Sequence, residues 1–178
     1  AIRAKLFGSR PNFAGYILYR GNYPESRLKN RSAIDFGDEV NRWHTVCFEG
    51  GHGVVYMIPN FDDRTDVGHR RVNWAIYAPT PLGLDFEEAR SIPVGEVSEE
   101  LYAELDAILE SDFPPAYQDV IRESAREEVS VQPIYADTVS SYVKGRVMLI
   151  GDAGTVTRPH TGSGATKALQ DALALERL

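Results

Sequence analysis

The amino-acid sequence predicts an α+β fold, in which a largely antiparallel sheet with flanking helices is followed by a strand–loop–helix segment. Runs of β-prone residues, separated by turns that contain Gly or Pro, fill much of the first half of the 178-residue chain. Apolar residues at helical spacing follow, and a short apolar run returns before a Gly-rich loop near the C-terminal end. Together these three observations favour strands packed with helices plus one further strand–helix unit.

The expected sheet is built from short β-prone runs. Residues 42–48 and 53–59 flank a Gly-Gly turn and are predicted to form a hairpin. Residues 16–21 alternate in polarity before this hairpin, and residues 71–77 return as a further strand with aromatic side chains on alternate faces. Residues 129–135 form another β-prone run. We expect these strands to form a largely antiparallel sheet, with one face packed and the other open.

Two helices are expected beside the sheet. Ser98 is placed as an N-cap, and the acidic Glu99 and Glu100 follow it in the first turn, where they favour the helix dipole. Pro114-Pro115 ends this helix, and a second one is expected from about residue 116 to residue 125. We expect both helices to buttress the sheet rather than to carry chemistry.

The remaining segments are less regular. Residues 11–15 are predicted to form a turn, and residues 22–40 a loop with a short helix. The segment Ala1–Gly8 begins inside a helical pattern without a cap, and Leu178 lies inside another such pattern. We therefore expect this chain to be part of a longer protein.

The segment from Gly145 to Leu178 carries the most informative chemistry. The apolar run 146–150 ends at Gly151-Asp152, and a Gly-rich loop leads into a helix that begins near Ser163. Strand, loop and helix in this order build ligand sites at the carboxyl ends of strands. The Asp152 carboxylate, placed at such a strand end, can accept hydrogen bonds from ligand hydroxyl groups.

Two glycines near the start of this helix complete the pattern. Gly162 and Gly164 remove side chains and let a ligand approach the backbone, while the first helical amides favour an anion or an electron-rich atom. A ligand with a hydroxylated chain and a ring that gains negative charge would suit both contacts. The alternative is an ordinary strand–loop–helix in which Asp152 caps a turn, but the combined pattern favours ligand binding.

These residues resemble the C-terminal flavin motif of FAD-dependent aromatic hydroxylases, the para-hydroxybenzoate hydroxylase class. The similar residues are Gly151-Asp152-Ala153, Pro159, Gly162-x-Gly164 and Asp171-Ala172, although Thr155 and Thr166 stand where the family often has His and Asn. The phrases Ala-Gly-Tyr-x-x-x-Arg-Gly at residues 14–21 and Asn-Trp-x-x-Tyr at residues 73–77 are similar to the branch that contains 2,6-dihydroxypyridine 3-monooxygenase.

The resemblance implies FAD as the cofactor and NAD(P)H as a co-substrate. Asp152 would bind the ribitol chain, the helix start would face the N1/O2 edge of the isoalloxazine ring, and Pro159-His160 would lie beside that ring. The implied FAD-binding residues are Gly151, Asp152, Ala153, Pro159, Gly162, Ser163, Gly164 and Ala165.

His160 and Tyr56 are the candidate catalytic residues, because an imidazole or a phenol beside the flavin could share a hydrogen bond or a proton with a phenolic substrate. The alternative for His160 is a solvent-exposed loop residue. Tyr56, Arg20 and Trp74 could line the substrate pocket or be packing residues of a half-buried sheet, and packing is favoured for Trp74.

The resemblance also implies a domain organisation. Residues 1–11 would be a remnant of a Rossmann-like FAD-binding domain, residues 12–136 a substrate-binding domain whose sheet roofs the flavin, and residues 137–178 a return to the FAD-binding domain. The Gly-x-Gly-x-x-Gly motif of a first nucleotide-binding strand is absent from this sequence.

Composition limits the partners. A net charge of −7 without a basic stripe argues against nucleic acid. The single Cys47 excludes an internal disulfide and favours a cytoplasmic location, and no apolar run reaches the ~20 residues of a membrane span. The four histidines do not fall at metal-ligand spacing, so no metal site is expected.

The implied activity is hydroxylation of a phenolic or hydroxylated N-heteroaromatic ring, with O2 as oxidant, through a flavin hydroperoxide. We expect this belongs to the longer protein and that the 178-residue chain alone is inactive. One alternative is a catalytically silent fragment or interaction module, whose unpaired strand edge would favour association with another chain, such as a homodimer. Another is a flavoenzyme of the same fold with a different reaction, such as an epoxidase or a reductase.

Overall fold

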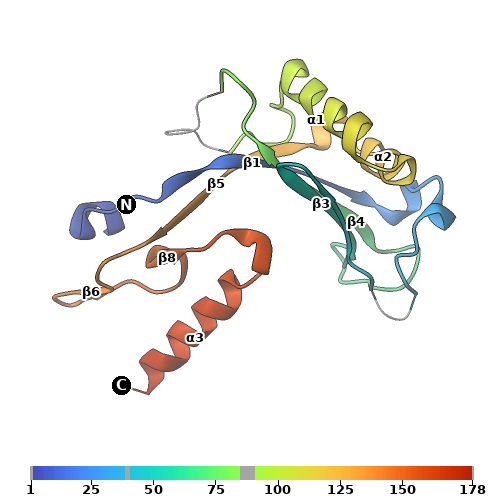
Figure 1. The fold of residues 1–178 in the computed structure, drawn as a ribbon. Helices are drawn as coiled ribbons and strands as arrows, with labels where there is room; N and C mark the ends of the chain where they lie inside the picture. Colours follow the sequence, from blue (N-terminus) through green and yellow to red (C-terminus); the bar gives the residue numbers. More distant parts are fainter. Residues whose placement is uncertain (1, 39–40, 85–90, 178) are drawn as a thin grey trace. The chain divides into compact units, whose positions relative to one another are not determined.

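The computed structural model describes residues 2–38, 41–84 and 91–177 (Figure 1). Ala1, Leu178 and the last two residues of the predicted loop 22–40 lie outside the described residues. The chain separates into two compact units, which we call unit 1 (residues 1–14 and 134–178) and unit 2 (residues 15–133). The assignment of residues 1–11, 12–136 and 137–178 to flavin-binding and substrate-binding domains stays a prediction.

The main sheet has the strand order β2-β3-β4-β1-β5-β8. The pairs β2–β3, β3–β4, β4–β1 and β5–β8 are antiparallel. The predicted α+β class, with a largely antiparallel sheet, is therefore confirmed. The strands are β1 (Asn12–Pro24), β2 (His44–Phe48), β3 (Gly51–Ile58), β4 (Arg71–Pro79), β5 (Ser130–Thr138) and β8 (Thr155–Val156).

Strand β1 is longer at both ends than the sequence predicted. Residues 12–15 belong to the strand rather than to a turn, although Gly15 has a positive φ of 86°. At the other end, residues 22–24 pair with Asn73, Val72 and Arg71 of β4 instead of starting the loop. The backbone partners that β4 supplies are a tertiary effect, and they override the local turn preference of Gly, Asn and Pro.

The predicted hairpin is confirmed. Phe48 pairs with Gly51, so Glu49 and Gly50 form the turn between β2 and β3. Gly50 has a φ of 82°, and a Cβ on Gly51 would lie 2.2 Å from the carbonyl oxygen of Tyr77. Both glycines are therefore required, one by its backbone conformation and the other by the approach of β4.

Helices α1 (Glu99–Asp112) and α2 (Pro115–Arg122) lie side by side over one face of the sheet of unit 2 (Figure 1). Ser98 caps α1 as predicted, because its hydroxyl oxygen accepts a hydrogen bond from the Leu101 amide at 3.2 Å. The Pro114-Pro115 break is also confirmed, since α2 begins at Pro115.

The core of unit 2 lies between these helices and the sheet. Trp74 is fully buried, and its indole Nε1 donates to the Ser124 hydroxyl at 2.8 Å. The Tyr23 hydroxyl donates to the Val120 carbonyl at 2.7 Å, and a Cβ on Gly53 would overlap the ring of Phe113. The packing role predicted for Trp74 is confirmed. The largest fully buried side chains are Trp74, Tyr19, Tyr23, Ile17, Met57 and Ile76.

Unit 1 contains the C-terminal strand–loop–helix. The predicted strand 146–150 is shorter than expected: only Val147–Met148 (β7) form a strand, which pairs with Val143–Lys144 (β6). Among the described residues the rest of this run has no strand partner, so it does not extend the ladder. The helical elements are η1 (Arg3–Phe7), η5 (Gly151–Ala153), η6 (Pro159–Thr161) and α3 (Gly164–Glu176).

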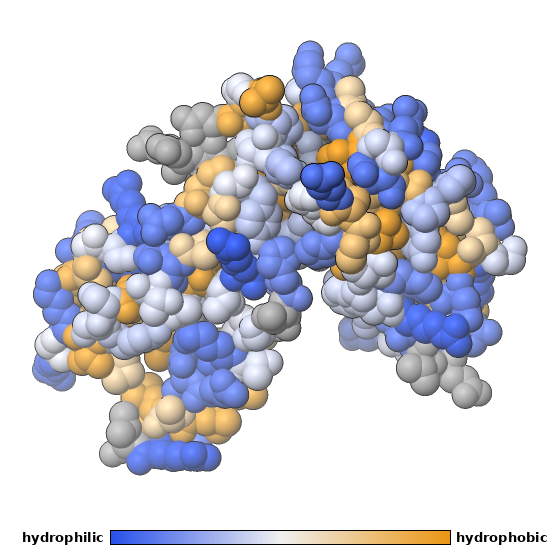
Figure 2. Space-filling view, viewed as in Figure 1, coloured by the Kyte–Doolittle hydropathy of each residue, from blue (hydrophilic) through white to orange (hydrophobic). Residues whose placement is uncertain are grey.

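Helix α3 starts where the sequence predicts. Among the described residues, no side chain of this helix is buried. Leu169, Leu173 and Leu175 are exposed, and Figure 2 shows hydrophobic surface over this helix. In the part of the chain that the structure describes, no helix combines the length and the apolar character needed to cross a membrane.

A buried ion pair joins the end of β1 to the start of β4 in unit 2. Both Glu25 and Arg70 are almost fully buried, and the carboxylate accepts bonds from the Arg70 guanidinium at 2.9 and 3.0 Å and from the Gly68 amide at 2.9 Å. Arg31 adds a second ion pair at 3.3 Å. Burial raises the pKa of Glu25, but these hydrogen bonds and charges outweigh it, so the pKa lies below its usual range.

We predict that Glu25→Gln destabilises the fold by about 3–5 kcal/mol at pH 7, because it leaves the Arg70 guanidinium buried without its countercharge. The measurement is urea unfolding followed by circular dichroism. Since the folded pKa is depressed, the stabilisation is present above the ordinary glutamate pKa of about 4.3 and is lost as the pH falls below it. The difference between wild type and variant should therefore shrink in acid.

The matched control is Glu127→Gln, which removes an exposed partner of Arg126 and should change stability by less than about 0.5 kcal/mol. Equal effects of the two substitutions would contradict a structural role for the Glu25–Arg70 pair.

Candidate functional site

The loop before α3 in unit 1 is fixed to the helix by Asp171. The Asp171 carboxylate accepts a hydrogen bond from the Gly151 amide at 2.8 Å and pairs with Lys167 at 2.6 Å. Gly151 is buried at a φ of 55°, and a Cβ there would lie 3.2 Å from the Cβ of Ala168. The backbone of Gly151 therefore packs directly against α3, and the next residue is held close to the helix start.

Asp152 lies at the N-terminus of α3. Its Oδ1 atom is 3.9 Å from the position that a Cβ on Gly164 would occupy, and the side chain is exposed. Gly162 adopts the left-handed conformation, with a φ of 61°, and directs the chain into the helix, with open space around its missing side chain. One carboxylate and a set of helical amides without intrahelical partners thus lie together.

The other predicted flavin residues occupy the same segment of unit 1. Ala153 ends η5, Pro159 and His160 form η6, and Ala165 is exposed in the first turn of α3 after Ser163. All eight predicted residues therefore fall between positions 151 and 165 around one helix start. Their contact with FAD stays a prediction.

His160 is exposed, which agrees with the alternative that it is a loop residue in solvent. Its surroundings nevertheless influence its charge. Partial burial and then the positive charge of Arg158 lower the pKa of His160 below its usual range. At neutral pH the imidazole is therefore mainly uncharged and able to accept a proton.

A second group of candidate residues lies on the sheet of unit 2, on the face opposite α1 and α2. Tyr56 stacks on Trp43 with ring centroids 4.2 Å apart, and His52 stacks on Tyr77 at 4.6 Å. Tyr16 lies 6.4 Å from Tyr77. We call the surface formed by Trp43, His52, Tyr56, Tyr77 and Tyr16 the aromatic face.

The strand register explains why these side chains share one face. His52 is opposite Tyr77 and Tyr56 is opposite Asn73 between β3 and β4, whereas Trp74 and Ile76 alternate toward the helices. Arg20 joins this face, since its guanidinium reaches the Asn73 side chain at 3.5 Å. Of the pocket candidates named from sequence, Tyr56 and Arg20 lie on the aromatic face, and Trp74 lies on the other.

The environment keeps the Tyr77 hydroxyl protonated. Burial raises the pKa of Tyr77, the neighbouring Tyr16 and Tyr56 raise it further, and the Arg20 charge only partly offsets them. At neutral pH the hydroxyl therefore keeps its proton. Sequence reasoning missed Trp43, His52 and Tyr77 as site residues, although alternation along the strands would have placed His52 and Tyr77 on the same face as Tyr56.

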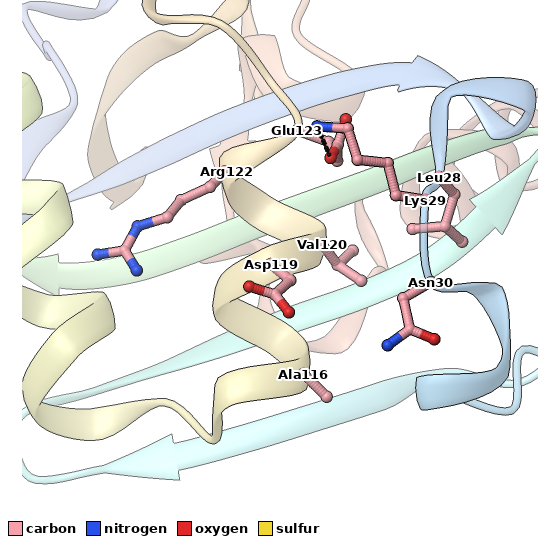
Figure 3. Close-up of a pocket in the computed structure, with 8 residues that line it drawn as sticks. All are labelled: Leu28, Lys29, Asn30, Ala116, Asp119, Val120, Arg122 and Glu123. Atoms are coloured by element: carbon pink, nitrogen blue, oxygen red, sulfur yellow. Dashed lines mark ion pairs between the residues drawn. The ribbon is translucent and has the colours of Figure 1, made fainter.

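A cavity of about 390 Å³ between residues 28–30 and α2 is a weaker candidate (Figure 3). Lys29 and Glu123 form an ion pair of 2.7 Å at its edge, and Arg122 points away from it toward Asp106 and Glu110. Because its basic side chains are already paired with protein carboxylates, the cavity offers little to an anionic ligand. Across the described ranges, no three His, Cys, Asp or Glu side chains come together as metal ligands.

Known proteins resemble the chain over almost its whole length. It is 28% identical to 2,6-dihydroxypyridine 3-monooxygenase of Paenarthrobacter nicotinovorans, over 98% of this chain and 44% of that protein. It is 26% identical to 6-hydroxynicotinate 3-monooxygenase of Bordetella bronchiseptica, over 99% of this chain and 40% of that protein. The chain thus spans less than half the length of these relatives.

Solved structures of related proteins also resemble this chain. The structure of 2,6-dihydroxypyridine-3-hydroxylase from Arthrobacter nicotinovorans matches with a TM-score of 0.81 at 25% identity, over 98% of this chain and 44% of that one. A salicylate hydroxylase substrate complex shares the fold, with a TM-score of 0.65 at 20% identity, over 96% of this chain and 41% of that one. The FAD binding domain-like family matches residues 13–134, which include all of unit 2. Since this match covers more than half of the chain, the protein belongs to the FAD binding domain-like family.

Proposed function

We propose that the protein to which this chain belongs is an FAD-dependent, NAD(P)H-using monooxygenase that hydroxylates a small phenolic or hydroxylated N-heteroaromatic ring. Relatives of the chain carry such activities in their names, among them 2,6-dihydroxypyridine 3-monooxygenase, FAD-dependent urate hydroxylase and 6-hydroxynicotinate 3-monooxygenase. The observation that carries the proposal is the position of the Asp152 carboxylate beside Gly164 at the start of α3.

The residues of unit 1 fit the two chemically different ends of a flavin. The exposed Asp152 carboxylate is an acceptor for ribitol hydroxyl groups, and charge-assisted bonds of this kind are among the stronger ones in proteins. The missing side chains at Gly162 and Gly164 leave room for a ring to approach the backbone. The amides and dipole of α3 would stabilise negative charge at that edge of the ring.

When bound and reduced by NAD(P)H, FAD supplies the activation of O2. The part of the chain's own residues is then to bind, to orient and to move a proton. The aromatic face of unit 2 offers stacking surface for a planar ring. We propose that His160 of unit 1 acts as an uncharged base. For Tyr56 of unit 2 we propose a role as a hydrogen-bond donor.

The flavin assignment predicts that Asp152→Ala weakens FAD binding by roughly 10- to 100-fold, the loss expected for hydrogen bonds to a charged acceptor. The measurement is titration of FAD followed by its fluorescence. The control Glu176→Ala removes another exposed carboxylate at the opposite end of α3 and should leave the affinity unchanged. Equal affinities of wild type and Asp152→Ala would remove this residue from the site.

The activity is tested on the protein that contains this chain together with FAD. With NADH or NADPH, ¹⁸O2 and a panel of hydroxypyridines and phenols, we expect one ¹⁸O atom in the product, detected by mass spectrometry. Formation of an epoxide, or NAD(P)H oxidation that yields only hydrogen peroxide with every ring, would contradict the hydroxylase assignment.

A further inference from the structure

The loop formed by residues 151–155 of unit 1 is held by contacts on both sides of Asp152. On the N-terminal side, the Asp171 carboxylate accepts a hydrogen bond from the Gly151 amide at 2.8 Å. Among the described residues, the Asp152 carboxylate itself accepts no hydrogen bond from the protein. The position of this carboxylate therefore depends on how firmly the backbone beside it is fixed.

Tyr142 holds the C-terminal side of this loop. Its phenol and the Thr155 hydroxyl share a hydrogen bond. Its ring packs against the Gly154 backbone, since a Cβ on Gly154 would lie 2.5 Å from the Cε1 atom of the ring. Gly154 has a φ of −92°, which any residue can adopt, so a glycine is required here by the ring and not by the turn.

Lys167 of α3 connects the contacts on the two sides. Its ammonium group donates to Oδ2 of Asp171 at 2.6 Å, and this is the same oxygen atom that accepts the bond from the Gly151 amide. The ammonium nitrogen also lies 5.6 Å from the centroid of the Tyr142 ring, within the range of a cation–π interaction. The bond from Lys167, and then the bond from Gly151, hold the pKa of Asp171 below its usual range. At neutral pH the carboxylate is therefore ionised, and both bonds are charge-assisted.

This network withdraws a flexible side chain from solvent in order to fix a loop. The Lys167 side chain is 24% exposed, whereas that of Lys29, which also forms an ion pair, is 83% exposed. Ordering a lysine costs conformational entropy, and partial burial costs hydration free energy. Core packing does not account for the arrangement, because no described side chain of α3 is buried. The network does fix the backbone on each side of Asp152, so that a ligand binds without the cost of ordering the loop.

Resting on the proposed function, we propose that Tyr142 and Lys167 are positioning residues of the flavin site. They act through loop 151–155 on Asp152, the carboxylate that would accept hydrogen bonds from the ribitol chain of FAD. Neither side chain needs to touch the cofactor. Their effect on FAD binding therefore requires the Asp152 carboxylate, which would not be so for residues that contact the cofactor directly.

The first test measures the FAD affinity of the protein that contains this chain, by fluorescence titration. Lys167→Met and Tyr142→Leu should each weaken FAD binding about three- to tenfold, because the cation–π contact is lost and the loop is no longer ordered in advance. Lys167→Arg keeps a cation beside the Tyr142 ring and should bind FAD as wild type does. The control Arg177→Met removes an exposed positive charge at the opposite end of α3 and should leave the affinity unchanged.

A double-mutant cycle separates positioning from direct contact. In the Asp152→Ala background, Lys167→Met should weaken FAD binding by less than about twofold, since the carboxylate that Lys167 positions is gone. Equal effects of Lys167→Met in the two backgrounds would contradict the proposal, because they would mean that Lys167 contacts the cofactor or stabilises unit 1 as a whole.

Hydrogen–deuterium exchange without FAD tests the loop itself. Lys167→Met and Tyr142→Leu should speed exchange of the Gly151 amide, which is bonded to Asp171, and should leave α1 and α2 of unit 2 unchanged. Tyr142→Phe keeps the ring, removes only the bond to Thr155, and should give a smaller increase in the same segment. Unchanged exchange at residues 151–155 in all three variants would contradict the proposal.

The outcomes separate this inference from the proposed function. If Asp152→Ala weakens FAD binding but the Tyr142 and Lys167 variants do not, the positioning role is wrong and the flavin assignment stands. If wild type binds no FAD, or if Asp152→Ala binds it equally well, the flavin assignment fails. The positioning role then fails with it, even where exchange in loop 151–155 changes.

Discussion

The position of β4 between β3 and β1 is the constraint on which the organisation of unit 2 depends. Its backbone pairs along both edges, from Arg71 to Tyr77 with β3 and from Arg71 to Pro79 with β1. Because side chains alternate along a strand, this double register decides which residues enter the core and which form the opposite surface. A shift by one residue would exchange Trp74, which bonds to Ser124 in the core, with Asn73 and Ala75.

The same register gives the two faces different chemistry. Toward α1 and α2, the sheet presents large apolar side chains. The Trp74 indole and the Tyr23 hydroxyl find hydrogen-bond partners there, whereas the buried Tyr19 hydroxyl has none among the described residues. On the opposite face it presents stacked aromatic rings. The first face forms the core of unit 2, whereas the second leaves aromatic rings outside the core, which is why we propose that it binds a ligand.

Much of this fold could be predicted because its signals are local. The hairpin at Gly50, the Ser98 cap and the Pro114-Pro115 break each depend on a few neighbouring residues, and each is found in the structure. The C-terminal end of β1 could not be predicted, since residues 22–24 are strand because they pair with distant residues of β4. The run 146–150 is shortened to β7 because the rest of it has no strand partner among the described residues.

The residues of the candidate site also differ in how far the local sequence could predict them. The flavin segment around Asp152 and Gly164 is contiguous in sequence, so its residues could be named from their order alone, and the structure brings them together at the start of α3. The bond between Asp171 and the Gly151 amide, which fixes that loop, joins residues 20 positions apart and was not foreseen. His52 and Tyr77 share the aromatic face with Tyr56 only because of the pairing of β3 with β4.

The most direct test of the central claim, that the loop around Asp152 and the start of α3 bind flavin, is hydrogen–deuterium exchange of this chain with and without saturating FAD. The amides of residues 164–166 in the first turn of α3 lack partners within the helix and should exchange markedly more slowly when FAD is bound. The helices of unit 2, α1 and α2, should show no comparable change. Unchanged exchange at residues 151–165 under saturating FAD would contradict the assignment of this segment as the flavin site.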